Sequence, residues 1–361
     1  MTDNNGWDHK RIKAQARDQG VKINELVALA PNNDPFYCGT NSDIKRAQWF
    51  ADIWESYGYC EGVHLRRIHY KLVSMPNSQK HDGRPYENGA NDWAYLCDAS
   101  RSARYLGLVS PTAFEDKRNP HALIEGGPSY LGNPNIYFDD YEDRFTAWEL
   151  PAIQWNLKNN VNLAMPKPSV TGYDDNGVAD QPYHLEVWIE KTTMENELLP
   201  VCGQLGITYL AGPGFQSITR VIDLLQRVRQ FGKPTIIFYI SDFDPAGEVM
   251  PVGVSRQIEY WKNKYAPGAD IKLIPLALTL QQVVNYDLPR KPIKASDKRK
   301  SGFEDRRGEG AVELDALEAL YPGELTRTLK EAAEPYRDQE LRNKLAKTES
   351  KAEDEVAEAW N

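Results

Sequence analysis

The residues of this chain best suited to chemistry are three carboxylates, Glu190, Asp242 and Asp244. Glu190 ends the β-rich apolar run LEVWI, and the two aspartates follow the continuous apolar run PTIIFYIS. Such runs are typical of buried strands, so each acidic group is expected where a strand ends. Carboxylates that meet repel one another unless a cation lies between them, and oxygen ligands without nearby Cys or His favour a hard ion. The pattern therefore predicts a Mg²⁺ site, with Mn²⁺ as a substitute ion.

The stretch between these acidic groups predicts how they are positioned. Apolar residues recur at helical spacing over 192–205 and 218–231, and a short β-rich run lies between them at 207–210. Together with the flanking strands this makes β-α-β-α-β, which implies a parallel sheet with right-handed crossovers. The strand ends of such a sheet meet at one edge, so the three carboxylates are expected to converge. Gly212-Pro213-Gly214 follows the second strand at that edge, and Gly247 is expected to let the backbone turn closely after the aspartates.

Each acidic signal also has a plainer interpretation when it stands alone. A DxD sequence is commonly a solvated turn or the N-cap of a helix, and a lone Glu after a strand commonly has no function. The combination of both at the ends of a β-α-β-α-β unit, with a glycine-rich turn between them, favours the metal site.

A second group of chemically competent residues lies in RRIHYK, over 66–71, within a predicted helix. Arg66 and Tyr70 are one turn apart and share a face, where an arginine can neutralise a phosphate and place a phenol against it. A tyrosine hydroxyl has a pKa of about 10, so it needs a base, a cation or a positioned phosphate to act as a nucleophile. The alternative interpretation is that Tyr70 packs in a helical core.

Several of these segments together resemble a known family. IEKTT, AGPGFQSITR and SDFDPAG resemble the three signatures of a Toprim domain, in the variant found in the A subunit of topoisomerase VI and in related meiotic double-strand-break transesterases. ALTLQQVVNYDLPRKPIKASDKR and GAVELDAL are similar to segments that close this domain in phage and bacterial homologues. RRIHY resembles the family's Arg-x-x-(Tyr/Phe)-Tyr motif through Arg66 or Arg67 and Tyr70, with His69 where the family has an aromatic residue. The resemblance covers roughly residues 40–335.

The resemblance implies a type IIB DNA topoisomerase A-subunit-like transesterase, an isomerase acting on double-stranded DNA. Tyr70 would form a 5′-phosphotyrosyl DNA link with help from Mg²⁺ and Glu190, and a homodimer would make double-strand breaks. DNA would be bound by Arg66, Arg67 and Lys71, and by Arg118, which resembles an arginine of the family's wing and is otherwise a solvated loop charge. The alternatives are a metal-dependent nuclease, in which water attacks and no covalent intermediate forms, and a non-catalytic DNA-binding scaffold.

The sequence contains no GxxxxGK[ST] phosphate loop, so strand passage would need a separate GHKL-type ATPase B subunit. Composition sets weaker limits. The chain has 361 residues, 41% of them hydrophobic and 26% charged, with no membrane-spanning run and no signal-peptide pattern, so a cytoplasmic, nucleoid-associated protein is expected. Its four cysteines form no CxxC, which suggests neither a zinc site nor a disulfide framework.

The net charge of −9 is compatible with DNA because binding depends on the local field. Residues 62–118 carry nine Lys and Arg against six Asp and Glu, and residues 289–308 carry eight against three. The second segment is predicted to be a loop that either contacts DNA or is merely mobile. Beyond it, Glu313 and Asp315 either add carboxylates to the metal site or have a capping or surface role.

The fold class predicted is α/β, in a multidomain α+β chain. An N-terminal extension over 1–40 precedes a winged helix over 41–120, built from three helices and a wing-like strand pair. A spacer and linker over 121–183, with a predicted helix over 138–160, leads to a Toprim domain over 184–335 that has a parallel sheet flanked by helices. A charged helix over 336–361 ends the chain.

Overall fold

The computed structural model describes residues 9–30, 33–116, 119–127, 135–137, 169–171, 178, 180–212 and 217–360. It divides into two compact units, of which the first comprises Met1–Glu125 with Tyr183–Pro335 and the second Gly126–Pro182 with Tyr336–Asn361. The segments predicted as winged helix and Toprim domain both lie in the first unit. Three predictions concern residues outside the described ones: Arg118, the Pro213-Gly214 part of the glycine-rich turn, and the helix over 138–160.

The first unit is built on a four-stranded parallel sheet in the order β4-β3-β5-β6. Its strands are β3 (His184–Ile189), β4 (Ile207–Ala211), β5 (Thr235–Ile240) and β6 (Ile271–Ala277). Every residue of β3, β4 and β5 is buried, which explains why these strands appear in the sequence as continuous apolar runs. The predicted β-α-β-α-β unit and its parallel sheet are confirmed. Ile189 pairs with both Ala211 and Ile240, so the three strands end in register at one edge.

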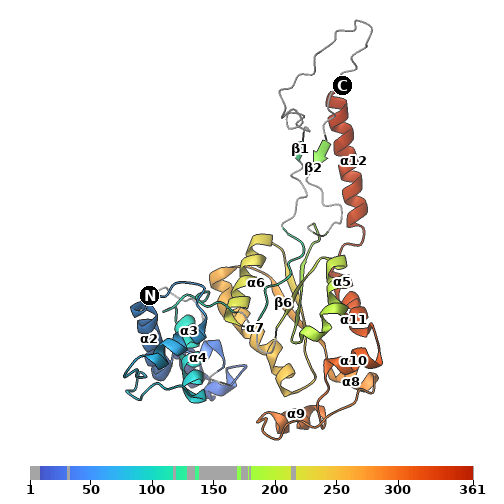
Figure 1. The fold of residues 1–361 in the computed structure, drawn as a ribbon. Coiled ribbons are helices and arrows are strands. Elements are labelled where there is room, and N and C mark those ends of the chain that lie inside the picture. The colour runs from blue at the N-terminus through green and yellow to red at the C-terminus, as the bar shows by residue number, and fades with distance from the viewer. Residues whose placement is uncertain are drawn as a thin grey trace, which may run out of the picture. The chain divides into compact units, whose positions relative to one another are not determined.

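Helices cover both faces of this sheet. Figure 1 shows α6 and α7 on one face and α5 and α11 on the other. Their bounds are α5 Glu195–Leu205 (preceded by the 3₁₀ turn η4, Thr192–Met194), α6 Ile218–Phe231, α7 Pro245–Tyr265 and α11 Glu324–Ala333. The predicted apolar face of α6 is fully buried and packs with Trp188 and Tyr239 of the sheet. The side chain of Ser217 caps this helix by accepting the Arg220 N–H, and Gly232 ends it in the left-handed conformation.

The N-terminal part of the first unit is helical. It contains α1 (His9–Gln19), the 3₁₀ turns η1 (Ile23–Glu25) and η2 (Pro35–Tyr37), α2 (Asn41–Ser56), α3 (Leu65–Ser74) and α4 (Ala90–Tyr105). The three helices predicted over 41–120 are confirmed, and they share a core that includes Phe50, Ile68 and Leu96. The predicted wing-like strand pair is not confirmed. Between the described residues of this segment only isolated bridges form, Val63 with Phe114 and Gln79 with Pro85, and Pro85 has no N–H with which to extend a ladder.

Specific polar contacts join this helical part to the sheet part. The buried Arg220 guanidinium of α6 donates to the Asn119 carbonyl at 3.0 Å and to the Asp116 carbonyl at 3.0 Å. The Tyr260 hydroxyl of α7 donates to the Tyr105 carbonyl at 2.7 Å, and Arg256 pairs with the fully buried Asp34 carboxylate at 3.1 Å. These contacts explain why the two segments form one compact unit.

After β6 the chain forms α8 (Leu280–Asn285), α9 (Lys300–Arg307), α10 (Leu314–Leu320) and α11. The prediction of a loop throughout 289–308 was therefore wrong for 300–307. Phe303 anchors this otherwise polar helix to the rest of the unit. Its side chain is 1% exposed and contacts the ring of Phe243, with centroids 5.2 Å apart. On the same helix Arg306 and Arg307 both pair with Glu248 of α7.

In the second unit, β1 (Asn135–Tyr137) pairs antiparallel with β2 (Ser169–Thr171), and α12 (Leu341–Trp360) packs against β2. The helix predicted for the C-terminal segment is confirmed by α12, and the 3₁₀ turn η5 (Glu334–Tyr336) precedes it. Gln181 and Asp338 exchange two hydrogen bonds in this unit, at 2.8 and 3.3 Å. None of the described helices combines the length and the apolar character needed to cross a membrane.

Candidate functional site

The three predicted carboxylates converge at the carboxyl edge of the sheet. Glu190 directly follows β3, and Asp242 and Asp244 follow its neighbour β5. The Asp242 backbone N–H donates to Glu190 Oε2 at 3.4 Å, although 52 residues separate them in sequence. Burial, and then the charges of Asp242 and Asp244, raise the pKa of Glu190 to about 7. The ionised form of Glu190 is therefore disfavoured at this position, and a nearby positive charge would stabilise it.

Lys191, the residue after Glu190, already supplies part of that charge. Its ammonium lies 3.1 Å from Asp242 Oδ2 and 2.8 Å from Asp315 Oδ2, and it also pairs with Glu313. Burial alone lowers the pKa of Lys191, but the hydrogen bonds to Asp315 and Asp242 raise it overall. Glu313 and Asp315 therefore lie beside the cluster. The alternative prediction of a capping or surface role also holds, because Glu313 is the N-cap residue of α10 and both side chains are partly exposed. The role of Lys191 was not predicted, and its adjacency to Glu190 in IEKTT was the one signal for it.

Asp242 and Asp244 differ in their hydrogen bonds. Asp242 is 9% exposed and its Oδ1 accepts the Leu314 N–H at 2.7 Å, which ties the end of β5 to the start of α10. Asp244 is the N-cap of α7, because its Oδ1 accepts the N–H groups of Ala246 at 2.8 Å and Gly247 at 2.6 Å. The plainer interpretation of the DxD sequence thus also holds for its second residue.

Gly247 is required by the close approach of two backbone segments. A Cβ atom at this position would lie 2.0 Å from the Asp242 carbonyl oxygen, far inside any van der Waals contact. The prediction that Gly247 allows a close turn after the aspartates is confirmed, and the glycine holds Asp242 and Asp244 at the edge of the sheet.

The described residues contain no group of three or more His, Cys, Asp or Glu side chains that is already arranged to hold a metal ion. The chemistry of the donors nevertheless fits a hard divalent ion, because all of the convergent ligands are carboxylate oxygens. The raised pKa of Glu190 shows that this carboxyl would gain from a cation. Since the Lys191 ammonium now contacts Asp242, we expect a bound ion to replace that contact.

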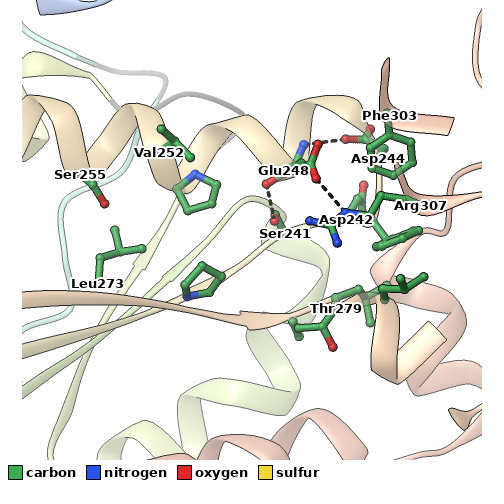
Figure 2. A pocket seen from close by; sticks show the side chains of 17 residues that line it. Ser241, Asp242, Asp244, Glu248, Val252, Ser255, Leu273, Thr279, Phe303 and Arg307 are labelled. Atoms are coloured by element: carbon green, nitrogen blue, oxygen red, sulfur yellow. Dashed lines mark hydrogen bonds and ion pairs between the residues drawn. The ribbon is translucent and has the colours of Figure 1, made fainter. Parts of the chain in front are cut away.

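A cavity of about 550 Å³ opens beside the aspartates, between α7, β6 and α9. Figure 2 shows its lining, with Asp242 and Asp244 at one end and Val252, Ser255 and Leu273 at the other. Arg307 lines the cavity, but its Nε lies 2.8 Å from Glu248, which also lines it. Arg307 is the one cation among the described lining residues, and Glu248 neutralises it. The cavity therefore offers no unpaired positive charge beside the acidic cluster.

The predicted tyrosine lies on an exposed face of α3. Tyr70 is 56% exposed, and its neighbours on the helix surface are also exposed: Arg66, Arg67 and Lys71. The opposite face is buried through Ile68, His69 and Leu72. The alternative interpretation that Tyr70 packs in a helical core is therefore wrong, and core packing applies instead to His69.

His69 is fixed by a polar network under this face. Its Nδ1 lies 2.7 Å from the Tyr86 hydroxyl and its Nε2 lies 3.2 Å from Asn88 Oδ1. The family resembled has an aromatic residue here, and His69 retains ring packing against Trp93 and Tyr86. The imidazole therefore lies within the core, and both of its nitrogens have partners beneath the exposed face.

No hydrogen bond, ion pair or ring contact between the described residues connects α3 with the carboxylate cluster. Within one chain the structure thus presents two separate groups, a basic face that carries Tyr70 and an acidic edge that carries Glu190, Asp242 and Asp244. Comparison of the chain with protein-family models and with curated proteins found no match.

Proposed function

We propose that this protein cleaves double-stranded DNA by metal-assisted transesterification, with Tyr70 as the nucleophile. The observation that carries the proposal is the convergence of Glu190, Asp242 and Asp244 at the sheet edge, with a Glu190 pKa of about 7. Perturbed carboxyl groups of this kind cluster at functional sites. The exposed tyrosine among basic side chains on α3 supports the same proposal from an independent part of the fold.

Each residue has a distinct role in this proposal. Arg66 or Arg67 would hold the scissile phosphate, and Lys71 would contact the flanking backbone. The Tyr70 oxygen would form a bond to phosphorus as the bond to the 3′ oxygen breaks, and the phenol proton would pass through solvent to that oxygen. Bound Mg²⁺, held by the three carboxylates, would supply positive charge beside the phosphate. The products are a 5′-phosphotyrosyl end and a 3′ hydroxyl, so the bond can be resealed.

A homodimer is part of the proposal. No contact between the described residues joins Tyr70 to the carboxylates of its own chain, so a second copy that places its tyrosine at this acidic edge would complete each site. One tyrosine would then cut each strand. Full strand passage would require a separate ATPase subunit, because this chain contains no phosphate-binding loop.

The test is incubation of the protein with supercoiled plasmid and Mg²⁺ or Mn²⁺, stopped by denaturant and analysed with and without protease. The proposal expects breaks whose ends carry protein, lost in Tyr70→Phe and in Asp242→Ala. Tyr321→Phe is the matched control, because Tyr321 is also exposed, at 41%, and lies on another part of the unit.

A second candidate is a metal-dependent nuclease that uses water as the nucleophile. It is favoured because Tyr70 makes no contact with the acidic edge in the part of the chain that the structure describes. Protein-free breaks that survive Tyr70→Phe and vanish with Asp242→Ala would establish it in place of the transesterase. Binding of DNA that depends on Arg66, without metal-dependent breaks under any condition, would indicate a scaffold.

A further inference from the structure

A second cavity, of about 560 Å³, lies where residues 28–30 and Asn33, α4, the start of α6 and α7 meet. Three arginines contribute to its lining, Arg101 and Arg104 from α4 and Arg299 from the turn before α9. None of the described residues that line it is Asp or Glu. The contrast with the cavity beside Asp242 is informative, because that one has a similar volume but contains Glu248 next to its arginine. Three cations without a carboxylate among the described lining residues give this cavity a local positive charge, although the net charge of the protein is −9.

Arg104 is the residue that distinguishes this cavity. Its Nε is buried and has no hydrogen-bond partner. Among the described residues Arg104 makes no ion pair, and its one ring contact is with Phe114, 5.0 Å from guanidinium to centroid. Burial lowers the pKa of Arg104 to about 10, so it remains charged at neutral pH. The Nε of Arg104 is therefore a buried donor that the described residues leave without an acceptor, which favours a ligand oxygen at this point of the cavity.

The other polar groups of the cavity favour an anion as that partner. Arg101 and Arg299 each pair with a carboxylate outside the lining, Asp98 at 2.9 Å and Asp297 at 2.9 Å, and they also line the cavity. Ser217 and Ile218 place the first turn of the 14-residue helix α6 at the wall. A helix N-terminus adds positive potential and N–H groups, which are suited to a phosphate.

The remaining walls are apolar and include Leu29, Ile218 and Val249. An inorganic ion would make no contact with these apolar walls. A phosphate attached to a flat apolar group would contact both the arginines and the apolar walls. The volume lies within the range of about 300–1,000 Å³ that is usual for small-molecule sites. We propose that this cavity binds the phosphate and base of a nucleotide, either free or at the end of a DNA strand. The proposal does not rest on DNA cleavage, since it uses neither Tyr70 nor the carboxylate cluster.

The test measures binding to the full-length protein by calorimetry with EDTA present, so that no divalent ion takes part. The probes are dATP, deoxyadenosine, and a short single strand with and without a 5′ phosphate. We expect dATP to bind and deoxyadenosine not to bind, and Arg104→Met to weaken dATP binding by at least about tenfold. Arg229→Met is the matched control, because Arg229 is exposed at the far end of α6 and should leave binding unchanged.

Thermal unfolding provides a second readout that a merely structural arginine would not reproduce. In chloride, Arg104→Met should unfold at or above the temperature of the parent, because it removes a buried Nε donor that has no hydrogen-bond partner. In phosphate at equal ionic strength, the parent should gain stability and Arg104→Met should not. Arg299→Met, at a partly exposed side chain, tests the same cavity if Arg104→Met fails to fold.

The outcomes separate the two sources of the phosphate. Binding of dATP in preference to the strand would identify a free nucleotide, and binding of the phosphorylated strand alone would identify a DNA end. Failure of every probe to bind the parent, or equal affinity in the parent and Arg104→Met, would overturn the proposal.

Discussion

Replacement of Glu190 by Gln should stabilise the metal-free protein above neutral pH. The carboxyl has a pKa of about 7 in the folded chain, against a usual value of 4.5, because of burial and the charges of Asp242 and Asp244. The folded state therefore binds the proton more tightly than the unfolded state, so the parent loses stability as pH rises from about 4.5 to 7. That difference corresponds to at most about 3 kcal/mol. Because Glu190 is partly exposed and solvent screens it, we expect about 1–2 kcal/mol.

The assay is urea unfolding with EDTA, at about pH 8 and about pH 5. Gln does not titrate but keeps the oxygen that accepts the Asp242 N–H, so its advantage should appear at the higher pH and largely disappear at the lower. Glu55→Gln, at an exposed position of α2, is the control and should change neither curve. Addition of Mg²⁺ should reverse the order, since about 100 times its Kd stabilises a binding-competent parent by about 2.7 kcal/mol. A loss of stability in Glu190→Gln at the higher pH, or a gain independent of pH, would refute the electrostatic reasoning.

Three further changes test other parts of the site. Arg227→Met should destabilise the fold by about 3–5 kcal/mol in urea unfolding, because it strips the guanidinium from Glu186, which has no exposed surface; a loss below about 1 kcal/mol would contradict this. Lys191→Met should tighten Mg²⁺ binding by about tenfold in calorimetry, since it frees Asp242 from its 3.1 Å ion pair; weaker binding would show instead that the ammonium helps to hold the site together. Gly247→Ala should cost about 1–3 kcal/mol and lower Mg²⁺ affinity, because its Cβ would lie 2.0 Å from the Asp242 carbonyl oxygen, and unchanged affinity would argue that this turn does not position the ligands.

The sheet and the meeting of its acidic groups could be predicted because they depend on local pattern and topology. Buried parallel strands are apolar throughout, α6 has an apolar stripe between a serine cap and a terminal glycine, and parallel strands share one edge. Once Glu190 and Asp242 were assigned to the carboxyl ends of strands in one parallel sheet, their position at the same edge followed. The position of β4 at the edge of the sheet did not follow, because the periodicity of apolar residues carries no information on strand order.

The features that were missed depend on contacts between distant segments. Lys191 meets Asp315, 124 positions away, because Leu314 is tied to Asp242 and brings α10 to the sheet edge. Phe303 is the one buried residue of helix α9, and the segment around it is polar. Neither the direction of a lysine side chain nor the burial of one isolated aromatic residue can be deduced from spacing alone.

Two glutamates, Glu186 on β3 and Glu190 just after it, differ in how the chain compensates their charge. Glu186 is fully buried, yet its pKa falls to about 2, because the effect of burial is outweighed by Arg227 and His184. The chain can therefore compensate a buried carboxylate completely where structure requires it. Glu190 is less buried and its pKa rises to about 7, while the nearby Lys191 contacts Asp242 and Asp315. The same fold thus neutralises Glu186 but keeps Glu190 beside Asp242 and Asp244 at a cost in stability. We infer that this arrangement suits a site for an external cation.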